Sequence, residues 1–317
     1  MNSQTQIEMP DSSYWKKTIF ITKETFHASI EDDVLKLSAA LSYYTIFSLP
    51  PLLIIIISIT GFFFGSDAVR GELFGQINGL VGNEAAAQIQ DAIKNVSLSR
   101  SNTFATILGV VILLIGASGV FAEIQDSVNF IWGIRAKPKR GVVKFIVNRL
   151  MSFSMIGSVG FLLMVGLIIN SITDMLYNKL EIFFPIEALF LFNTFNYLIV
   201  FAITSFLFTL IFKTLPDGKI AMRDCAIGGA FTSFLFMIGK FAIGAYLGSS
   251  SIASVYGAAG SVVVILVWVY YSAIILYIGA EFTKVFALTH GQKIIPNQYS
   301  VQIDKTCPEI VDRGVSE

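Results

Sequence analysis

The chain has 317 residues, of which 54% are hydrophobic and only 14% are charged, and its mean hydropathy is +0.70. A soluble domain carries about 25% charged residues, so this composition excludes an ordinary soluble globular protein. The formal net charge is zero, which gives no overall field to attract nucleic acid, and we expect no nucleic-acid partner. The two cysteines, Cys225 and Cys307, are too few for a disulfide framework or a metal cluster.

The first 36 residues predict a cytoplasmic N-terminal segment that contains an amphipathic helix. The polar beginning of the chain has neither an apolar region nor a cleavage site, so we expect no signal peptide. Trp15, Ile19, Phe26 and Ile30 recur at helical spacing, with lysines on another face. This pattern is typical of a helix that lies on the inner leaflet of a membrane. Lipid sensing and simple anchoring remain alternative roles for it.

Long apolar stretches dominate the rest of the chain. A helix needs about 20 apolar residues to cross the hydrocarbon core, and no segment alternates in polarity as a membrane-spanning strand would. The sequence therefore predicts an all-α integral membrane protein with a spanning domain at 37–287 and a disordered cytoplasmic tail at 288–317. Two amphipathic patterns in the loop after the first span predict short helices on the outer face. The six predicted spans are 37–64, 104–124, 150–172, 188–212, 225–247 and 257–280.

The positions of lysine and arginine predict the orientation of these spans. The N-terminal segment, the loops after the second and fourth spans, and the tail hold four, six, three and four basic residues. The alternate loops hold three, one and none. Because basic residues accumulate on the cytoplasmic side, we expect both termini, together with the loops after the second and fourth spans, in the cytoplasm.

Two adjacent prolines, Pro50 and Pro51, interrupt the first predicted span. Proline has no backbone donor, so the carbonyls of Ile46 and Phe47 lose their usual partners. Within a membrane such a break is tolerated where neighbouring groups satisfy the freed carbonyls. Polar side chains precede the break in the same helix: Tyr43, Tyr44 and Ser48.

Lys240 lies in the fifth predicted span, at about the same depth as the prolines. An ionisable group in hydrocarbon costs about 3 kcal/mol and is a functional candidate. We hypothesise that Lys240 donates to the carbonyls of Ile46 and Phe47 or to a polar cavity beside them. In the alternative, Lys240 extends outward to the membrane surface and the prolines only bend the helix.

Carboxylates stand near the cytoplasmic ends of the second and sixth spans. Glu281 lies about 20 Å from Lys240 in depth, so we predict that these two residues do not pair. We expect Glu281 to meet Lys284, three residues further on, or charged groups of the second span. Glu123 and Asp126 share a helical face there. This pair fits either a proton relay or a solvated helix end.

Small residues predict where helices approach each other closely. The segment between the fifth and sixth spans is short, small and uncharged, and re-entry into the membrane and a flexible gate are alternative roles for it. The candidate packing positions are Gly116, Gly119, Gly239, Gly244, Gly257 and Gly260.

The motifs of known catalytic sites are missing from this sequence. The two histidines, His27 and His290, flank the spans and belong to no zinc-binding or triad pattern. No phosphate-binding G-x-x-x-x-G-K-[ST] motif occurs. We therefore expect no enzymatic activity, no metal site, no cofactor and no ATP-driven motor.

Five blocks of the sequence resemble one family in the order in which the family carries them. They are "LSAALSYYTIFSLPPLLI", "NFIWGI", "LPDGKI", "FMIGKFAIGAYL" and "SVYGAAGSVVVILVWVYYSAIILYIGAEFTKVFA". Together they resemble the YihY/BrkB family of bacterial inner-membrane proteins over about residues 25 to 290. This chain departs from the family pattern in carrying a proline doublet where a single proline is expected.

The resemblance implies a six-span envelope protein with cytoplasmic termini and a transporter-like role. Some members are called virulence factor BrkB, and others were labelled ribonuclease BN. The two isolated histidines argue against the ribonuclease label for this chain. We expect a transporter whose substrate is hydrophobic or lipid-like, because the spans are rich in phenylalanine and poor in charge. The alternative is a non-transporting envelope scaffold or assembly factor. Membrane lipids are the expected partners, and the oligomeric state is open.

Overall fold

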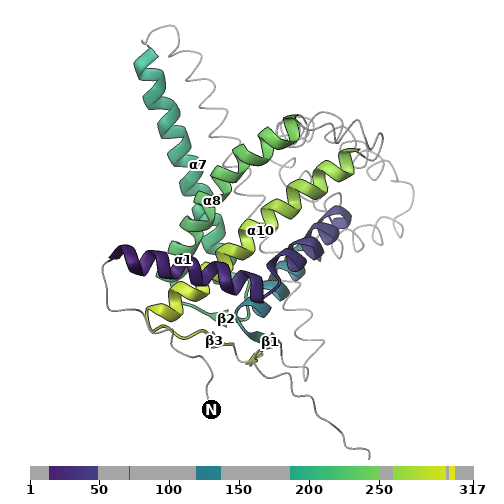
Figure 1. Cartoon of the computed structure of the whole chain (residues 1–317), viewed down its shortest axis with the longest axis vertical. Helices are drawn as coiled ribbons and strands as arrows, with labels where there is room; N and C mark the ends of the chain where they lie inside the picture. The colour runs from purple at the N-terminus through teal and green to yellow at the C-terminus, as the bar shows by residue number, and fades with distance from the viewer. Residues whose placement is uncertain are drawn as a thin grey trace, which may run out of the picture.

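The computed structural model describes residues 14–48, 71, 119–136, 186–249, 260–297 and 300–303 (Figure 1). The third predicted span, the outer-loop helices and the proline doublet lie outside these residues. Two described helices, 34–48 and 119–131, fall at the start of the first predicted span and at the end of the second. The other helices are α1 (Tyr14–Glu31), α7 (Ile186–Thr214), α8 (Met222–Ser249) and α10 (Gly260–Thr289).

Three described helices are long and apolar enough to cross a membrane. Their apolar segments are Tyr197–Thr214 of α7, Met222–Ile243 of α8 and Val262–Thr289 of α10. They coincide with the fourth, fifth and sixth predicted spans. At 1.5 Å per residue, helices of 28 to 30 residues are longer than the hydrocarbon core of about 30 Å. One end of each helix can therefore project beyond the core and carry polar groups.

The three long helices converge at one end and fan out toward the other (Figure 1). α8 packs against both α7 and α10. On the α7 side, the hydroxyls of Thr204 and Ser233 form a hydrogen bond, and Ser233 Oγ also donates to the carbonyl of Phe201 over 3.2 Å. A Cβ at Gly229 would overlap Thr209, so the two backbones approach closely at this glycine.

A reciprocal pair of glycine–threonine contacts joins α8 to α10. The side chain of Thr232 on α8 fills the space above Gly279, and Thr283 on α10 fills the space above Gly228. Both threonines are fully buried, and each hydroxyl donates to the carbonyl four residues earlier on its own helix over 2.7 Å. Each threonine side chain therefore packs against the facing glycine while its hydroxyl donor is satisfied within its own helix.

Two of the predicted packing glycines also allow close contacts. A Cβ at Gly239 on α8 would overlap the hydroxyl of Tyr271 on α10. A Cβ at Gly119 would lie 3.0 Å from Ser48 Oγ, so helices 34–48 and 119–131 approach each other there. The remaining predicted packing glycines lie where the structure does not describe side-chain surroundings: Gly116, Gly244, Gly257 and Gly260.

Four short strands join segments that are distant in the sequence. β1 (Ile134–Ala136) pairs antiparallel with β4 (Ser300–Gln302), and β2 (Gly218–Lys219) pairs with β3 (Ile295–Pro296). The expectation of an all-α chain omitted these strands. The expectation of a disordered tail is wrong for β3 and β4, because the tail pairs with two loops at the converging end of the helices (Figure 1). The distribution of lysine and arginine had predicted that these two loops and the tail lie on the same side of the membrane.

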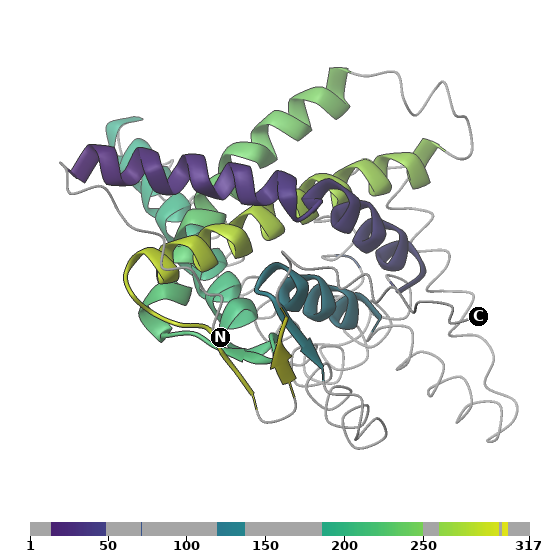
Figure 2. The ribbon, with the colours of Figure 1, turned by 60° about the horizontal axis from the view of Figure 1, so that its bottom comes forward.

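α1 crosses α10 at this end of the molecule (Figures 1 and 2). The face toward the protein carries Ile21 and two small polar residues, Thr25 and Ser29, all buried. The hydroxyls of Thr25 and Ser29 donate to carbonyls of α1 itself, at 2.8 and 2.7 Å. The predicted apolar face instead points away from the protein and is exposed: Trp15, Ile19, Phe26 and Ile30.

Candidate functional site at the converging helix ends

Four segments meet where the long helices converge. They are the end of α1, the end of helix 119–131, the turn after α7 and the last third of α10. Beside the end of α1, apolar side chains of the other segments form one core that includes Ile131, Trp132, Leu215 and Tyr277. Three of these segments carry the blocks "NFIWGI", "LPDGKI" and "AEFTKVF", so blocks that are far apart in sequence build one site.

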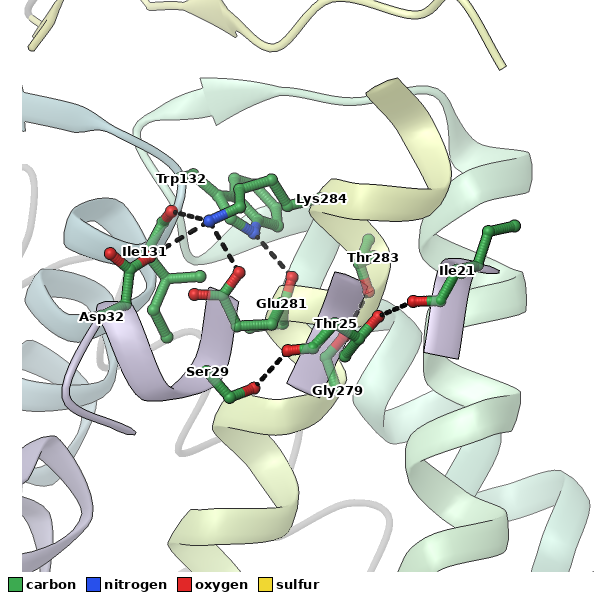
Figure 3. A network of polar contacts seen from close by, with 11 residues as sticks. Ile21, Thr25, Ser29, Asp32, Ile131, Trp132, Gly279, Glu281, Thr283 and Lys284 are labelled. Carbon is green, nitrogen blue, oxygen red and sulfur yellow. Dashed lines mark hydrogen bonds and ion pairs between the residues drawn. The ribbon is translucent and has the colours of Figure 1, made fainter. Parts of the chain in front are cut away.

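The site holds three charged side chains, Asp32, Glu281 and Lys284, which we call the ion cluster (Figure 3). Lys284 Nζ lies 2.6 Å from Glu281 Oε2 and 3.1 Å from Asp32 Oδ2. It also donates to the carbonyl of Ile131 over 2.9 Å. The ammonium thus ties α10 to the end of α1 and to the end of helix 119–131.

The ion cluster is almost completely withdrawn from solvent. The side chain of Glu281 is 0% exposed, and those of Asp32 and Lys284 are 8% and 16% exposed. The predicted contact between Glu281 and Lys284 is present, and the structure shows no ion pair between Glu281 and Lys240. Asp32 was not predicted, although it extends the buried stripe of Thr25 and Ser29 along α1. Asp33, with φ of 51°, forms the turn that separates α1 from helix 34–48.

Trp132 fixes the second side of the site. Its Nε1 donates to the carbonyl of Ala280 on α10 over 3.1 Å, and its side chain is buried (Figure 3). The indole packs close to Gly218, where an added Cβ would overlap Ile134. Trp132 therefore aligns the end of helix 119–131 with the segment of α10 that carries Glu281.

Asp217 organises the turn after α7. Its carboxylate accepts hydrogen bonds from Asn129 Nδ2 at 3.1 Å and Gln125 Nε2 at 3.4 Å, while its own N–H donates to Asn129 Oδ1 at 2.7 Å. Its carbonyl accepts hydrogen bonds from Ser300 Oγ and the N–H of Asn297, both at 2.8 Å. This turn therefore holds helix 119–131 and the tail together beside the ion cluster.

Glu123 and Asp126 have different surroundings despite their shared helical face. Glu123 is half-buried and accepts a hydrogen bond from Ser127 over 3.4 Å, whereas Asp126 is exposed. The exposure of Asp126 matches the solvated helix end better than a closed pair of carboxylates. Neither is part of the ion cluster.

The structure does not show the predicted contact of Lys240 with the carbonyls of Ile46 and Phe47. Lys240 is exposed and donates to neither carbonyl. The physical reason is its position on α8, one residue after Gly239, which occupies the face toward α10. The side chain therefore points away from that face, as in the outward-extending alternative.

The polar residues before the proline doublet also differ from one another in burial. Ser48 is buried against Gly119, whereas Tyr43 and Tyr44 are exposed. The ring of Tyr43 lies 5.0 Å from that of Phe47 and 6.0 Å from that of Tyr44, between ring centroids. These three rings form an exposed aromatic patch on helix 34–48.

Long apolar helices with charged groups buried at their common end identify this chain as an α-helical membrane protein. The chain belongs to the family described as virulence factor BrkB, whose model matches residues 25–300. It is similar to proteins named UPF0761 membrane protein. One, from Saccharophagus degradans, is 29% identical over 81% of this chain, and one from Teredinibacter turnerae is 27% identical over 84%. A relative from Pseudomonas aeruginosa is 26% identical over 80%.

The chain spans less than two thirds of the length of these curated relatives, between 57% and 60%. No solved structure is detectably similar to it.

Proposed function

We propose that this protein is a transporter of the bacterial inner membrane that moves a hydrophobic or lipid-like substrate without hydrolysing ATP. The observation that supports this most is the ion cluster of Asp32, Glu281 and Lys284, buried at the end of three apolar helices. Ionisable groups inside membrane proteins are rare and mark substrate or ion pathways. We propose no enzymatic activity and no cofactor for this chain.

A purely structural role explains the ion cluster less well. Removing charges from water costs several kcal/mol for each ion, and well-packed apolar residues are often as stabilising as a buried ion pair. A scaffold could therefore use apolar side chains at this position.

The nature of the proposed substrate follows from the apolar surfaces of the helices. The chain contains 28 phenylalanines, and the aromatic patch of Tyr43, Tyr44 and Phe47 is exposed. Such surfaces favour an acyl chain over a sugar or an inorganic ion. Lys240, exposed on α8, is a candidate contact for an anionic headgroup on the outer side.

We propose that α1 lies in the inner leaflet and binds membrane lipids, with both termini in the cytoplasm. Three faces of α1 support this arrangement. One face packs on the protein, the second exposes Trp15, Ile19, Phe26 and Ile30, and the third exposes polar residues that include His27 and Glu31. A helix beside a membrane bundle needs these three faces, because it meets protein, acyl chains and water at once.

The depth of α1 can be measured with spin labels on single cysteines. In the background Cys307→Ser, with Cys225 buried, labels at Ile19→Cys and Phe26→Cys should collide more with oxygen than with a water-soluble nickel complex. Labels at His27→Cys and Glu31→Cys should show the reverse, because these positions face water. Equal accessibility of all four labels to the nickel complex would refute the leaflet position.

The transport proposal can be tested with purified protein in sealed vesicles of phosphatidylethanolamine and phosphatidylglycerol. A fluorescent phosphatidylethanolamine in the outer leaflet is the probe, and dithionite measures how fast it becomes protected. We expect protection to be faster than in protein-free vesicles and to slow to that background with Glu281→Gln. Protection no faster than in protein-free vesicles, with folded protein, would contradict lipid transport and favour the scaffold alternative.

A further inference from the structure

The turn between α7 and α8 carries three basic side chains on its surface. Lys213, Lys219 and Arg223 are exposed, and Lys213 Nζ donates to the carbonyl of Ile220 over 2.6 Å. This bond brings the ammonium of Lys213 to the backbone that follows Lys219 and precedes the first turn of α8, where Arg223 lies. The three cations therefore form one group, which we call the basic patch.

The basic patch has no ion pair in the part of the chain that the structure describes. None of the salt bridges found there involves Lys213, Lys219 or Arg223. Of the two acidic side chains in the same segment, Asp224 is buried, and Asp217 accepts hydrogen bonds from helix 119–131. An anion that approaches this turn therefore meets three cations with which no carboxylate of the turn pairs.

An apolar stripe continues from the basic patch along the exposed face of α8. Its residues Phe234, Ile238 and Phe241 are each more than half exposed, and their spacing of four and three residues places them on one side of the helix. Arg223 lies on the same side, because it precedes Phe234 by about three helical turns and Phe241 by about five. A charged end and an apolar body thus share one surface of α8.

The length of this surface matches one leaflet of a membrane. From Arg223 to Phe234 the helix rises about 16 Å at about 1.5 Å per residue, and half of the hydrocarbon core measures about 15 Å. An acyl chain that starts at the basic patch therefore reaches Phe234 near the middle of the bilayer. A soluble phosphate or a nucleic acid would contact the cations but gain nothing from the apolar stripe, so the surface fits a lipid.

We propose that the basic patch and the apolar stripe together bind an anionic phospholipid of the inner leaflet. Its phosphate lies at Lys213, Lys219 and Arg223, and one acyl chain lies along α8 as far as Phe234. Basic residues at the cytoplasmic end of membrane helices attract anionic headgroups, whereas a zwitterionic lipid brings its own cation close to these three. The inference rests on the proposed orientation of α8 in the membrane and goes beyond transport, because binding does not require that the lipid is moved.

Fluorescence quenching beside the basic patch tests this assignment. A bimane label on Met222→Cys, in the background Cys307→Ser, reports on lipids next to Arg223, because Met222 is exposed and Cys225 is buried. In phosphatidylcholine nanodiscs, spin-labelled phosphatidylglycerol should quench the label at a mole fraction about tenfold lower than spin-labelled phosphatidylcholine. Equal quenching by the two lipids would overturn the proposal. Excess glycerol phosphate should not relieve the quenching; if it does, the surface binds the anion alone and the lipid assignment fails.

Removing the cations provides the second arm of the test. In K213Q/K219Q/R223Q, the preference for phosphatidylglycerol should disappear. Because Lys213 also holds the turn through the carbonyl of Ile220, the double variant K219Q/R223Q, which keeps that bond, should lower the preference even if the triple variant does not fold. An unchanged preference in the folded double variant would overturn the site.

Three lysines of α1 provide a matched control at the same end of the molecule. The variant K16Q/K17Q/K23Q removes as many positive charges as K213Q/K219Q/R223Q and should keep the preference for phosphatidylglycerol. An equal loss in this control would show general attraction between the protein and anionic lipid, which contradicts a site at α8. A preference for phosphatidylglycerol without lipid protection in the vesicle assay would support the site and contradict the transport proposal.

Discussion

Replacing Lys284 with methionine is expected to destabilise the protein by about 3–5 kcal/mol, the cost of breaking one side of a buried ion pair. The change leaves the carboxyl groups of Asp32 and Glu281 without their shared cation, and it also removes the contact with the Ile131 carbonyl. The effect can be measured as the free energy of unfolding in detergent micelles. The loss in the free energy of unfolding should be larger than the loss that most single substitutions cause.

A matched control is Lys240→Met, because Lys240 is exposed on α8. We expect a change within about 0.5 kcal/mol for this control. The triple variant D32N/E281Q/K284M should recover most of the stability that K284M loses, since it removes the charges together. A K284M variant as stable as the native protein would contradict the burial of the ion cluster.

Substituting Gly279 with valine is expected to be the second large effect. The new side chain would occupy the volume of Thr232 at the α8–α10 crossing. Overpacking a close-packed site costs about 1–3 kcal/mol, and more where the backbones must separate. Because the crossing is reciprocal, Gly228→Val should have a similar cost through Thr283. Thermal unfolding in detergent measures both.

The contact between Gly279 and Thr232 also allows a control in which both residues are changed together. In G279A/T232G the alanine takes the space that the threonine leaves, so the double variant should be more stable than the sum of its single changes predicts. A double-mutant cycle with that sign is expected for residues in contact. Strict additivity of the two changes would contradict the close approach of α8 and α10 at Gly279.

Sequence periodicity and composition predicted the local part of this structure. α7, α8 and α10 are long apolar segments, and a helix satisfies its own backbone in a membrane, so hydropathy alone locates them. The contact between Glu281 and Lys284 was also predictable, because residues three apart on a helix are neighbours. The apolar face of α1 was visible as well, although its buried face of small polar residues was not.

The rest of the site depends on contacts between distant segments. Asp32 reaches Lys284 across 252 positions, and Trp132 reaches Ala280 across 148. No periodicity encodes such contacts. The tail was expected to be disordered, but its segments Ile295–Pro296 and Ser300–Gln302 pair with strands of two distant loops. The predicted contact of Lys240 failed because depth alone does not determine which face of a helix a residue occupies.

Lipid protection in vesicles containing the folded D32N/E281Q/K284M variant tests most directly whether the ion cluster serves transport. This variant keeps the volume of the site and removes its charges. We predict that it unfolds at nearly the temperature of the native protein and protects the fluorescent lipid no faster than protein-free vesicles. Protection at the native rate by this neutral variant would show that the buried charges have no part in function.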